Sequence, residues 1–536
     1  MAFSELLEKV GSMGLFQVIA IIFLSIPVLL IHSHNLVQNF SAGVPDHYCR
    51  VNGTDKYNPF LRMGGSKTCL IEAEDIAGNS TDVMIMQRCQ DGWVYDKSIF
   101  SSTIVTEWDL VCGLGSLKEL AQSLFMAGVL VGSLIFGRLS DRWGRRAALL
   151  CSLLLIGVMG SGAAFSPNFS TYCAFRLLSG VALSGLLLNY LCLSLELVSP
   201  TSRTLVISVQ GYCSAAGQIL LAGLAYALRD WRWLQMAISL PFFIFFLYSW
   251  WLPESIRWLL VNNKPEIALR NLQRVAKING RKEEGEKISL EMVRCEVEKE
   301  DTAKFFNPNG GRPSLLDLFR TPGMRKITCC LMCVSFATNL SYFGLSMDLS
   351  GLDFGPHLVQ VIFGAIDMVA KFTCAMALSL LGRRTVQSGS LLCAGALLLL
   401  TFTVPKDLPV LRIVLVVLGK GCLSASSLCS YLYGGELFPT VVRQTGMGVT
   451  TMMARLGGIV SPVVLMAGGT FPFLPLLLFG VVPIVSGIVA FLLPELHNAP
   501  LPDTIQEVEE RARAEKKKLN PKEGEIVISV VMATRF

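Results

Sequence analysis

Apolar residues along the chain come in long blocks, and short polar segments separate most of them. A helix needs ~20 mostly apolar residues to cross the hydrocarbon core of a bilayer. Because blocks of this length recur, the pattern predicts an all-α membrane protein with twelve transmembrane helices. Their predicted ranges are 13–32, 117–137, 147–166, 171–198, 204–228, 233–252, 327–347, 357–381, 386–404, 409–433, 442–467 and 473–493.

Three longer polar stretches interrupt the spans and set the expected domain organisation. The spans fall six and six around the central stretch. We therefore expect the N-terminus with the first helix, an extracellular loop, the rest of an N-terminal bundle, a central cytoplasmic loop, a C-terminal bundle and a tail. In that order the segments are 1–32, 33–116, 117–252, 253–326, 327–493 and 494–536.

Composition and charge exclude several other classes of protein. Hydrophobic residues make up 52% of the chain and charged residues 16%, whereas soluble domains are about 25% charged. These values exclude a disordered chain, a coiled coil and a secreted disulfide scaffold. The net charge of +6 is explained by Lys and Arg in cytoplasmic loops. We therefore expect membrane lipid around the chain and no nucleic-acid partner.

Basic residues indicate the orientation of the chain in the membrane. They are concentrated in the short loops that follow even-numbered spans. Since such loops are enriched in Lys and Arg when they face the cytoplasm, we expect both termini to be cytoplasmic. Loops containing Arg229, Arg232 and Lys406 are mild exceptions.

The polar stretch 33–116 then lies outside the cell, and two features of its sequence agree with this side. It contains three glycosylation sequons, at Asn39, Asn52 and Asn79. It also contains an even number of cysteines, which predicts two disulfides in an oxidising compartment. Three connectivities are possible, and we expect the nested pairing, Cys49–Cys112 with Cys69–Cys89.

The chain contains an internal repeat. Gly144-Arg145-Arg146 recurs as Gly382-Arg383-Arg384 after 238 residues, and Pro253-Glu254 recurs as Pro494-Glu495 after 241 residues. A third landmark, Glu196 with Arg203, recurs as Glu436 with Arg443. Parallel halves of this kind hold a substrate near the middle of the membrane and expose it alternately to each side.

Several motifs resemble those of a known family. GRLSDRWGRR resembles the major facilitator signature, and PESIRWLL resembles the signature of sugar-porter-like members. MAFSELLEKVGSMGLFQ, STIVTEWDLVC, AQSLFMAGVLVG, GKGCLSAS and ELFPTVVRQTGMG resemble the organic anion transporters of solute carrier family 22, over roughly residues 1–510. The resemblance implies the major facilitator fold. It also implies exchange of organic anions, such as sulfate conjugates, carboxylates and urate-like anions, for a dicarboxylate across the plasma membrane.

Charged residues near the cytoplasmic ends of the spans repeat in both halves. Opposite charges that pair in one state and separate in another form a bistable element, so we expect an inner gate. Anchoring by positive residues alone is the alternative. The second half has no acidic residue matching Asp141, so the two gates are not identical. The gate residues are Asp141, Arg142, Arg145, Arg146, Glu196, Arg203, Glu254, Arg257, Arg383, Arg384, Glu436, Arg443 and Glu495.

Ionisable residues inside a span are costly and indicate function. Arg455, in the eleventh span, has no acidic residue three or four positions away. It must therefore find a partner on another helix or take its counter-charge from the substrate. The resemblance supports this role, because a basic pair matching Lys371 and Arg455 is linked to anion and dicarboxylate recognition in the relatives. In the cation-transporting branch, the position of Arg455 is typically acidic.

The other basic residues in the spans have alternative explanations. Lys371 has Asp367 one turn earlier, so an intrahelical ion pair is the alternative to substrate binding. Lys420 lies between glycines, which favours close helix packing. Arg176 lies early in its span, where a snorkelling or structural role is expected.

Aromatic residues are expected to complete a binding pocket. Candidates are Tyr342 and Phe343 in the seventh span, Phe363 in the eighth and Tyr431 in the tenth, with packing in the core or against lipid as the alternative. The resemblance places Tyr342, Tyr431 and Asn35 at cavity positions. Serines replace aromatic residues of the relatives at three positions, which predicts weaker binding of flat aromatic anions. These positions are Ser214, Ser335 and Ser427.

The last residues resemble a PDZ-binding tail. Thr534 precedes Phe536 by two positions, and such a tail binds by adding a strand to a sheet edge. This resemblance suggests a scaffold at an apical epithelial membrane.

Three functions compete, and the first is an anion exchanger. An organic cation, zwitterion or sugar carrier on the same fold is the second, and the basic residues argue against it. A membrane enzyme or receptor is the third. The five histidines are scattered, and neither a nucleophile motif nor a phosphate-binding glycine loop is present. We therefore expect no enzyme activity, no catalytic residue, no metal site and no cofactor.

Overall fold

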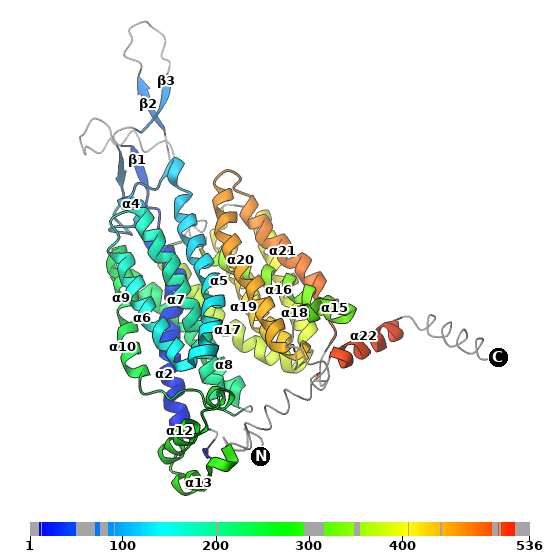
Figure 1. Cartoon of the computed structure of the whole chain (residues 1–536). Coiled ribbons are helices and arrows are strands. Elements are labelled where there is room, and N and C mark those ends of the chain that lie inside the picture. Colours follow the sequence, from blue (N-terminus) through cyan, green and yellow to red (C-terminus); the bar gives the residue numbers. More distant parts are fainter. Residues whose placement is uncertain are drawn as a thin grey trace, which may run out of the picture.

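The computed structural model describes residues 10–11, 13–49, 70–74, 84–89, 92–199, 202–293, 316–347, 354–405, 407–439, 442–495, 502 and 505–519. Long apolar helices form two bundles (Figure 1). The N-terminal half contains α2 (Leu15–Leu36), α5 (Leu117–Trp143), α6 (Arg145–Ala164), α7 (Phe169–Glu196), α8 (Arg203–Ala227), α9 (Trp231–Ser239) and α10 (Pro241–Ser249). The C-terminal half contains α16 (Pro322–Met347), α17 (Pro356–Leu381), α18 (Arg383–Thr403), α19 (Pro409–Leu437), α20 (Arg443–Gly468) and α21 (Leu474–Ala490).

Twelve apolar segments occupy the predicted spans. In the described part of the chain, eleven are long and apolar enough to cross a membrane, and α21 is apolar but has 17 residues. The sixth span is divided between α9 and α10 at Pro241, because proline has no N–H to donate inside a helix. The expected fold class, two bundles of six helices, is therefore confirmed.

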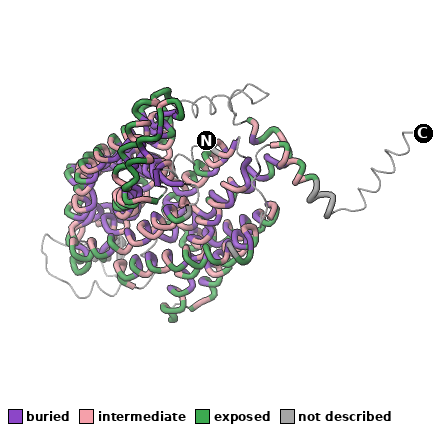
Figure 2. Tube along the Cα trace, turned by 90° about the horizontal axis from the view of Figure 1, so that it is seen from below, coloured by how far each residue is buried: buried purple, intermediate pink, exposed green. Residues whose placement is uncertain are grey.

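Each bundle has its own core, and the bundles meet along two pairs of helices. Seen from below, buried positions lie mostly on the inner sides of the helices and exposed positions on the outside (Figure 2). α5 packs on α20, and α8 packs on α17. Within the first half, Gly128 lets α5 approach α7 closely, because a Cβ there would lie 2.1 Å from the carbonyl oxygen of Leu177.

One end of the molecule carries the strands, and we call it the loop face (Figure 1). It contains α3 (Gln38–Ser41), α4 (Ile104–Glu107) and η2 (Cys112–Leu114). β1 (His47–Cys49) pairs with β4 (Trp93–Tyr95), and β2 (Leu70–Glu74) pairs with β3 (Met84–Arg88), both antiparallel. The Trp231 indole N–H donates to Glu107 Oε2 at 2.8 Å and ties α4 to α9.

The nested disulfide pairing predicted from the sequence is wrong. Cys49 forms a disulfide with Cys89. The β1–β4 ladder places Cys49 opposite Trp93, so the residues just before β4 lie beside it. Cys112 is also disulfide-bonded, whereas Cys69 lies outside the described residues, as do the sequons at Asn52 and Asn79.

The opposite end carries the helices that follow each bundle, and we call it the tail face (Figure 1). These are α11 (Ile256–Val261), α12 (Pro265–Ile278), α13 (Lys282–Glu286), α15 (Asp317–Arg320) and α22 (Ile505–Leu519). Asn279 Oδ1 accepts from the N–H of Phe16 at 2.9 Å, at the start of α2. Glu509 Oε1 accepts from the N–H of Gly323 at 2.6 Å, at the start of α16. The segment after each bundle thus caps the first helix of its own half.

Candidate functional site

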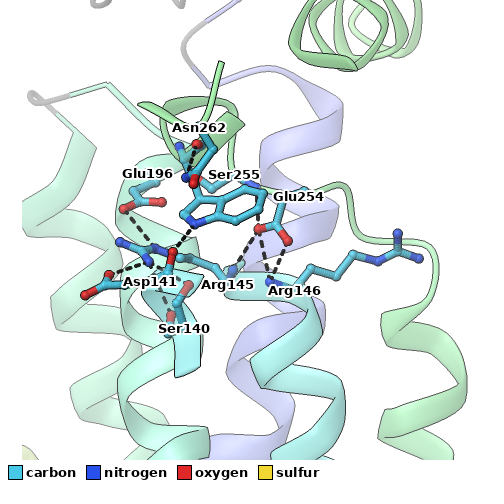
Figure 3. Close-up of polar contacts among 9 residues, drawn as sticks. Ser140, Asp141, Arg145, Arg146, Glu196, Glu254, Ser255 and Asn262 are labelled. Atoms are coloured by element: carbon cyan, nitrogen blue, oxygen red, sulfur yellow. Dashed lines mark hydrogen bonds and ion pairs between the residues drawn. The ribbon is translucent and has the colours of Figure 1, made fainter. Parts of the chain in front are cut away.

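Arg145 is the centre of a charge network on the tail face of the first half (Figure 3). Its guanidinium lies 2.8 Å from Asp141 Oδ1 and 3.7 Å from Glu196 Oε1. It also donates to the carbonyl oxygen of Ser140 at 2.9 Å. This network joins the ends of α5, α6 and α7.

Glu254, one of the predicted gate residues, contacts the beginning of α6. Its Oε1 accepts from the backbone N–H groups of Arg145 at 2.9 Å and Arg146 at 3.1 Å (Figure 3). These N–H groups have no partner inside α6, and the helix dipole favours a negative charge at this end. Glu254 is therefore a helix cap. Gly144 makes this approach possible, because its φ is +102° and a Cβ there would lie 2.2 Å from Glu254 Oε2.

The second half repeats this arrangement. Arg383 donates to Glu436 through two bonds, of 2.9 and 3.1 Å. Glu495 Oε1 accepts from the N–H of Arg383 at 3.0 Å, at the start of α18. Gly382 has φ +83°, and a Cβ there would lie 2.9 Å from the same oxygen. The sequence repeat is thus a repeat of contacts.

The ion pairs of Arg145 and Arg383 each join residues of a single half. The residues predicted as a gate therefore form one network in the first half and another in the second. The other predicted gate residues lie nearby. Arg146 donates to the carbonyl oxygen of Trp250, and Arg443 donates to that of Phe438. Arg384 lies over the ring of Phe491. Arg142 and Arg257 are exposed, and Arg203 is half-buried at the start of α8.

The polar contacts between the two halves that are seen among the described residues lie at the centre and toward the loop face. Near the loop face, the Asn39 amide donates to the carbonyl oxygen of Ser346 at 2.6 Å, and Phe40 stacks on His357. A glycan on this amide would compete with the contact to Ser346. The halves are therefore held together on the loop-face side of the molecule.

At the centre, one face of α8 carries three polar contacts, one turn apart. Lys371 Nζ donates to the carbonyl oxygen of Gly211 at 2.9 Å. The hydroxyl of Ser214 lies 2.8 Å from His32 Nε2. Gln218 donates to Asp367 Oδ2 at 2.7 Å. Since positions three and four apart share one face of a helix, α8 brings these residues of α2 and α17 together.

Asp367 and Lys420 form a fully enclosed pair. Lys420 Nζ lies 3.7 Å from Asp367 Oδ2, and both side chains have 0% exposure. The hydroxyl of Tyr342 donates to the same oxygen at 2.6 Å. Lys420 also donates to Gln218 Oε1 at 3.2 Å and lies over the ring of Phe363. A buried charge needs such compensation, so this cluster neutralises its own lysine.

The intrahelical pair suggested as an alternative for Lys371 is not what the structure contains. Asp367 directs its short contacts to Tyr342, Gln218 and Lys420. Lys371 instead donates to a neutral carbonyl oxygen across the interface between the halves, and its side chain is partly exposed. Lys371 is thus the less compensated of the two lysines.

Arg455 lies in α20 and is also partly exposed. Within the described ranges, its guanidinium has no hydrogen bond and no ion pair. Tyr190 and His32 are among its electrostatic neighbours. An unpaired guanidinium deep in a span can receive a carboxylate or sulfate through two parallel hydrogen bonds.

The predicted aromatic residues have different surroundings. Tyr342 belongs to the Asp367 cluster and lies edge-on to Phe343, 5.5 Å between ring centres. Phe343 lies beside Gly458, one turn beyond Arg455. Tyr431 is exposed and Asn35 is buried. Phe343 and Tyr431 thus remain candidate pocket walls, whereas Tyr342 has a structural partner.

Of the two roles expected for Arg176, snorkelling is excluded and the structural role is confirmed. Its side chain has 0% exposure because it lies inside the first bundle. The guanidinium donates to Gln122 Oε1 at 2.8 Å and to the carbonyl oxygen of His34 at 3.3 Å. It also lies 4.1 Å from the centre of the Phe125 ring. Neutral groups therefore surround this charge.

Sequence reasoning missed two central residues, His32 and Gln218. His32 is in the electrostatic range of Lys371, Asp367, Arg455 and Lys420, and it contacts Ser214, which the sequence had indicated only as a pocket wall. Ionisable or amide side chains inside apolar spans were the available signal for His32 and Gln218. No cluster of metal-binding side chains occurs among the described residues.

The chain is similar to known membrane transporters. Residues 95–507 match the family "Sugar (and other) transporter". "Solute carrier family 22 member 6-B" of Xenopus laevis is 47% identical, covering 96% of each chain. "Organic anion transporter 3" of Homo sapiens is 46% identical, covering 97% of this chain and 96% of that protein. The xylose transporter XylE from E. coli, in an inward-open conformation, is 15% identical with a TM-score of 0.60, covering 91% of this chain and 98% of that one.

Proposed function

Because the chain belongs to solute carrier family 22, within the sugar (and other) transporters of the major facilitator fold, we propose that it carries organic anions across a membrane. The observation that carries the proposal is the guanidinium of Arg455, in the middle of α20, which has no hydrogen bond and no ion pair within the described ranges. The relative named "Organic anion transporter 3" supports the choice of anions.

The charges at the centre favour a negatively charged substrate. Lys371, Lys420 and Arg455 are opposed by the single carboxylate of Asp367 in the electrostatic surroundings of His32. With all four ionised, the centre has two excess positive charges. Uncompensated charge in a region of low dielectric is costly, so binding of an anion is favourable there.

We further propose that the chain exchanges anions. Loading a dianion offsets both excess charges at once, and a dicarboxylate such as glutarate or succinate is a suitable counter-anion. Sulfate conjugates, carboxylates and urate-like anions are the proposed substrates, since guanidinium binds such groups through paired hydrogen bonds. Lys371, Phe343, Tyr431 and Asn35 are the proposed pocket residues beside Arg455.

Alternating access requires the two bundles to move against each other. The contacts of Asn39 with Ser346 and of Lys371 with Gly211 join the halves at the loop face and the centre. Opening toward the loop face would break them. The networks around Arg145 and Arg383 would keep each half rigid during this motion.

The remaining proposals concern location. We place the chain in the plasma membrane, with both termini in the cytoplasm and the sequons outside. Binding of a PDZ scaffold to Thr534 and Phe536, and an apical location, are separate proposals on residues that the structure does not describe.

Uptake of labelled estrone sulfate tests the proposed function. Cells expressing the chain are compared with and without glutarate preloading, for wild type, Arg455→Asp and the control Arg412→Asp. The control makes the same charge change at the beginning of α19. We expect glutarate to stimulate wild-type uptake. We also expect Arg455→Asp to reduce uptake by about tenfold or more, since a hydrogen bond to a charged group contributes about 1.5–3 kcal/mol.

Surface abundance is measured for each variant, so that loss of transport is separated from loss of protein. Equal loss in both variants at equal abundance would remove the special role of Arg455. Absence of preloading stimulation would contradict exchange. Wild-type uptake of tetraethylammonium without uptake of anions would favour the cation-carrier alternative.

A further inference from the structure

His32 is an ionisable residue of the first bundle that lies within electrostatic range of the central charges. It lies in α2, whose neighbouring histidine, His34, has a different environment. Positions two apart on a helix point in directions about 200° apart. His34 is fully buried beside Arg176 and Phe242, whereas the His32 ring contacts Ser214 of α8. Thus only the first of the two histidines faces the charged centre.

Ser214 fixes the His32 ring through one nitrogen and leaves the other without a partner. The Ser214 hydroxyl lies 2.8 Å from His32 Nε2. His32 Nδ1 is buried and has no hydrogen-bond partner among the described residues. Buried polar atoms are rarely left unpaired, and each exception needs an explanation such as an absent ligand. When the serine hydroxyl donates to Nε2, the imidazole carries its hydrogen on Nδ1 and can donate it.

The surroundings of His32 indicate what this donor would meet. Lys371 is its strongest electrostatic neighbour, followed by Asp367 and Arg455. Lys371 is anchored on Gly211 and His32 on Ser214, one turn apart on the same face of α8. The contacts of Asp367 with Tyr342, Gln218 and Lys420 all go to its Oδ2. Its Oδ1 has no hydrogen-bond partner among the described residues, and neither has His32 Nδ1, so the two atoms do not bond to each other. An anionic oxygen held by Lys371 would supply the acceptor that the Nδ1 hydrogen lacks.

Two separate cationic positions result. Lys371 lies where α17 packs on α8, and His32 of α2 contacts the same helix α8 at Ser214. Arg455, in contrast, belongs to α20, which packs on α5. The α8–α17 line of contact thus carries Lys371 and the enclosed Lys420, and the α5–α20 line carries Arg455. A small anion with one acidic group can occupy one position, but an anion with two separated acidic groups can occupy both.

Resting on the function proposed above, we propose that His32, held by Ser214, contacts the second acidic group of a dianion beside Lys371. His32 is then a residue that selects dicarboxylates over monoanions. The first acidic group is bound by Arg455, and the neutral imidazole adds a hydrogen bond without adding a charge. Monoanions bound at Arg455 do not require it.

Two substitutions separate the nitrogens of the ring. In His32→Gln, the amide replaces Nε2, so the contact with Ser214 can be kept while the Nδ1 donor is lost. In His32→Asn, the amide replaces Nδ1, so the donor can be kept. His47→Gln is the matched control, because His47 lies in β1 at the loop face and bonds to the carbonyl oxygen of Pro45.

The measurement is the inhibition constant of glutarate against estrone sulfate uptake, together with the KM of estrone sulfate. We expect His32→Gln to raise the glutarate constant by about tenfold, as for loss of a hydrogen bond to a charged group. The KM of the monoanion should change by less than about threefold. His32→Asn should raise the glutarate constant less than His32→Gln does, and His47→Gln should leave both values unchanged.

Three results would overturn the inference. The first is an unchanged inhibition constant of glutarate in His32→Gln. The second is an equal change in the glutarate constant and in the KM of estrone sulfate. The third is a larger rise of the glutarate constant in His32→Asn than in His32→Gln. Should His32→Gln fail to reach the surface, glutarate binding is measured on purified His32→Asn and Ser214→Ala instead. Wild-type affinity for glutarate in Ser214→Ala would show that Ser214 does not position the imidazole. Failure of the proposed function has a different signature, because wild type itself would then take up no organic anion.

Discussion

The two halves of the molecule are alike at the tail face and different at the centre. In both halves an arginine pairs with a glutamate at the end of the fourth helix, Arg145 with Glu196 and Arg383 with Glu436. In both, a later glutamate caps the third helix. Among the described residues at the centre, however, the second half supplies the cations and the carboxylate of Asp367, and the first half supplies His32, Ser214 and Gln218.

This difference separates two parts of the molecule: the repeated tail-face contacts, which we call the frame, and the candidate binding site at the centre. The repeated contacts hold helix ends in place, and either half needs them in order to move as a unit. The central residues need not repeat, because a substrate between the halves contacts each from a different side. The first half has a cation of its own in Arg176, but it is enclosed by Gln122, His34 and Phe125. The positive field at the centre therefore comes from the second half.

The largest expected effect is on the enclosed pair of the second half. Asp367→Asn leaves the Lys420 charge buried without a counter-charge, and breaking such a pair costs about 3–5 kcal/mol. We expect a large fall in surface abundance and in the thermal stability of the purified protein. The double variant Asp367→Asn/Lys420→Gln, which removes both charges, should recover most of the loss. If the double variant is no more stable than the single one, the pair is not self-compensating.

An intermediate effect is expected at the two glycines that precede the capped helices. Both have positive φ, and a Cβ would lie 2.2 Å from the Glu254 carboxylate at Gly144 but 2.9 Å from that of Glu495 at Gly382. Backbone strain of this kind costs about 1–3 kcal/mol. We expect Gly144→Ala to lower the melting temperature more than Gly382→Ala does. A larger decrease in melting temperature for Gly382→Ala would mean that the frames of the two halves do not hold their helix ends in the same way.

The smallest expected effect is at Asp141, one of the places where the tail-face networks of the two halves differ. Asp141 pairs with Arg145 in the first half only, and its side chain is 76% exposed. Exposed pairs one turn apart contribute about 0.3–0.5 kcal/mol. Asp141→Asn should therefore change the melting temperature very little. A strong loss of transport at unchanged stability would instead assign Asp141 to the motion between states.

Much of the fold could be predicted from the sequence because its causes are local. A helix must be apolar over its whole length to cross a bilayer, so the spans are visible as blocks, and the offset of the landmarks reveals two equivalent halves. The family motifs led to the same fold. Arg455 was also identified locally, since it has no acidic residue one turn away on its own helix.

What only the tertiary structure decided is which residues become partners. Asp367 pairs with Lys420 of another helix rather than with Lys371 one turn along its own, because the side chains of α8 and α16 complete the enclosure around that lysine. Cys49 pairs with Cys89 because β1 and β4 form a ladder. His32 joins the centre because α8 presents Ser214 to it. Periodicity along the chain specifies which residues share a face of one helix, but the partner that a face meets depends on how whole helices pack.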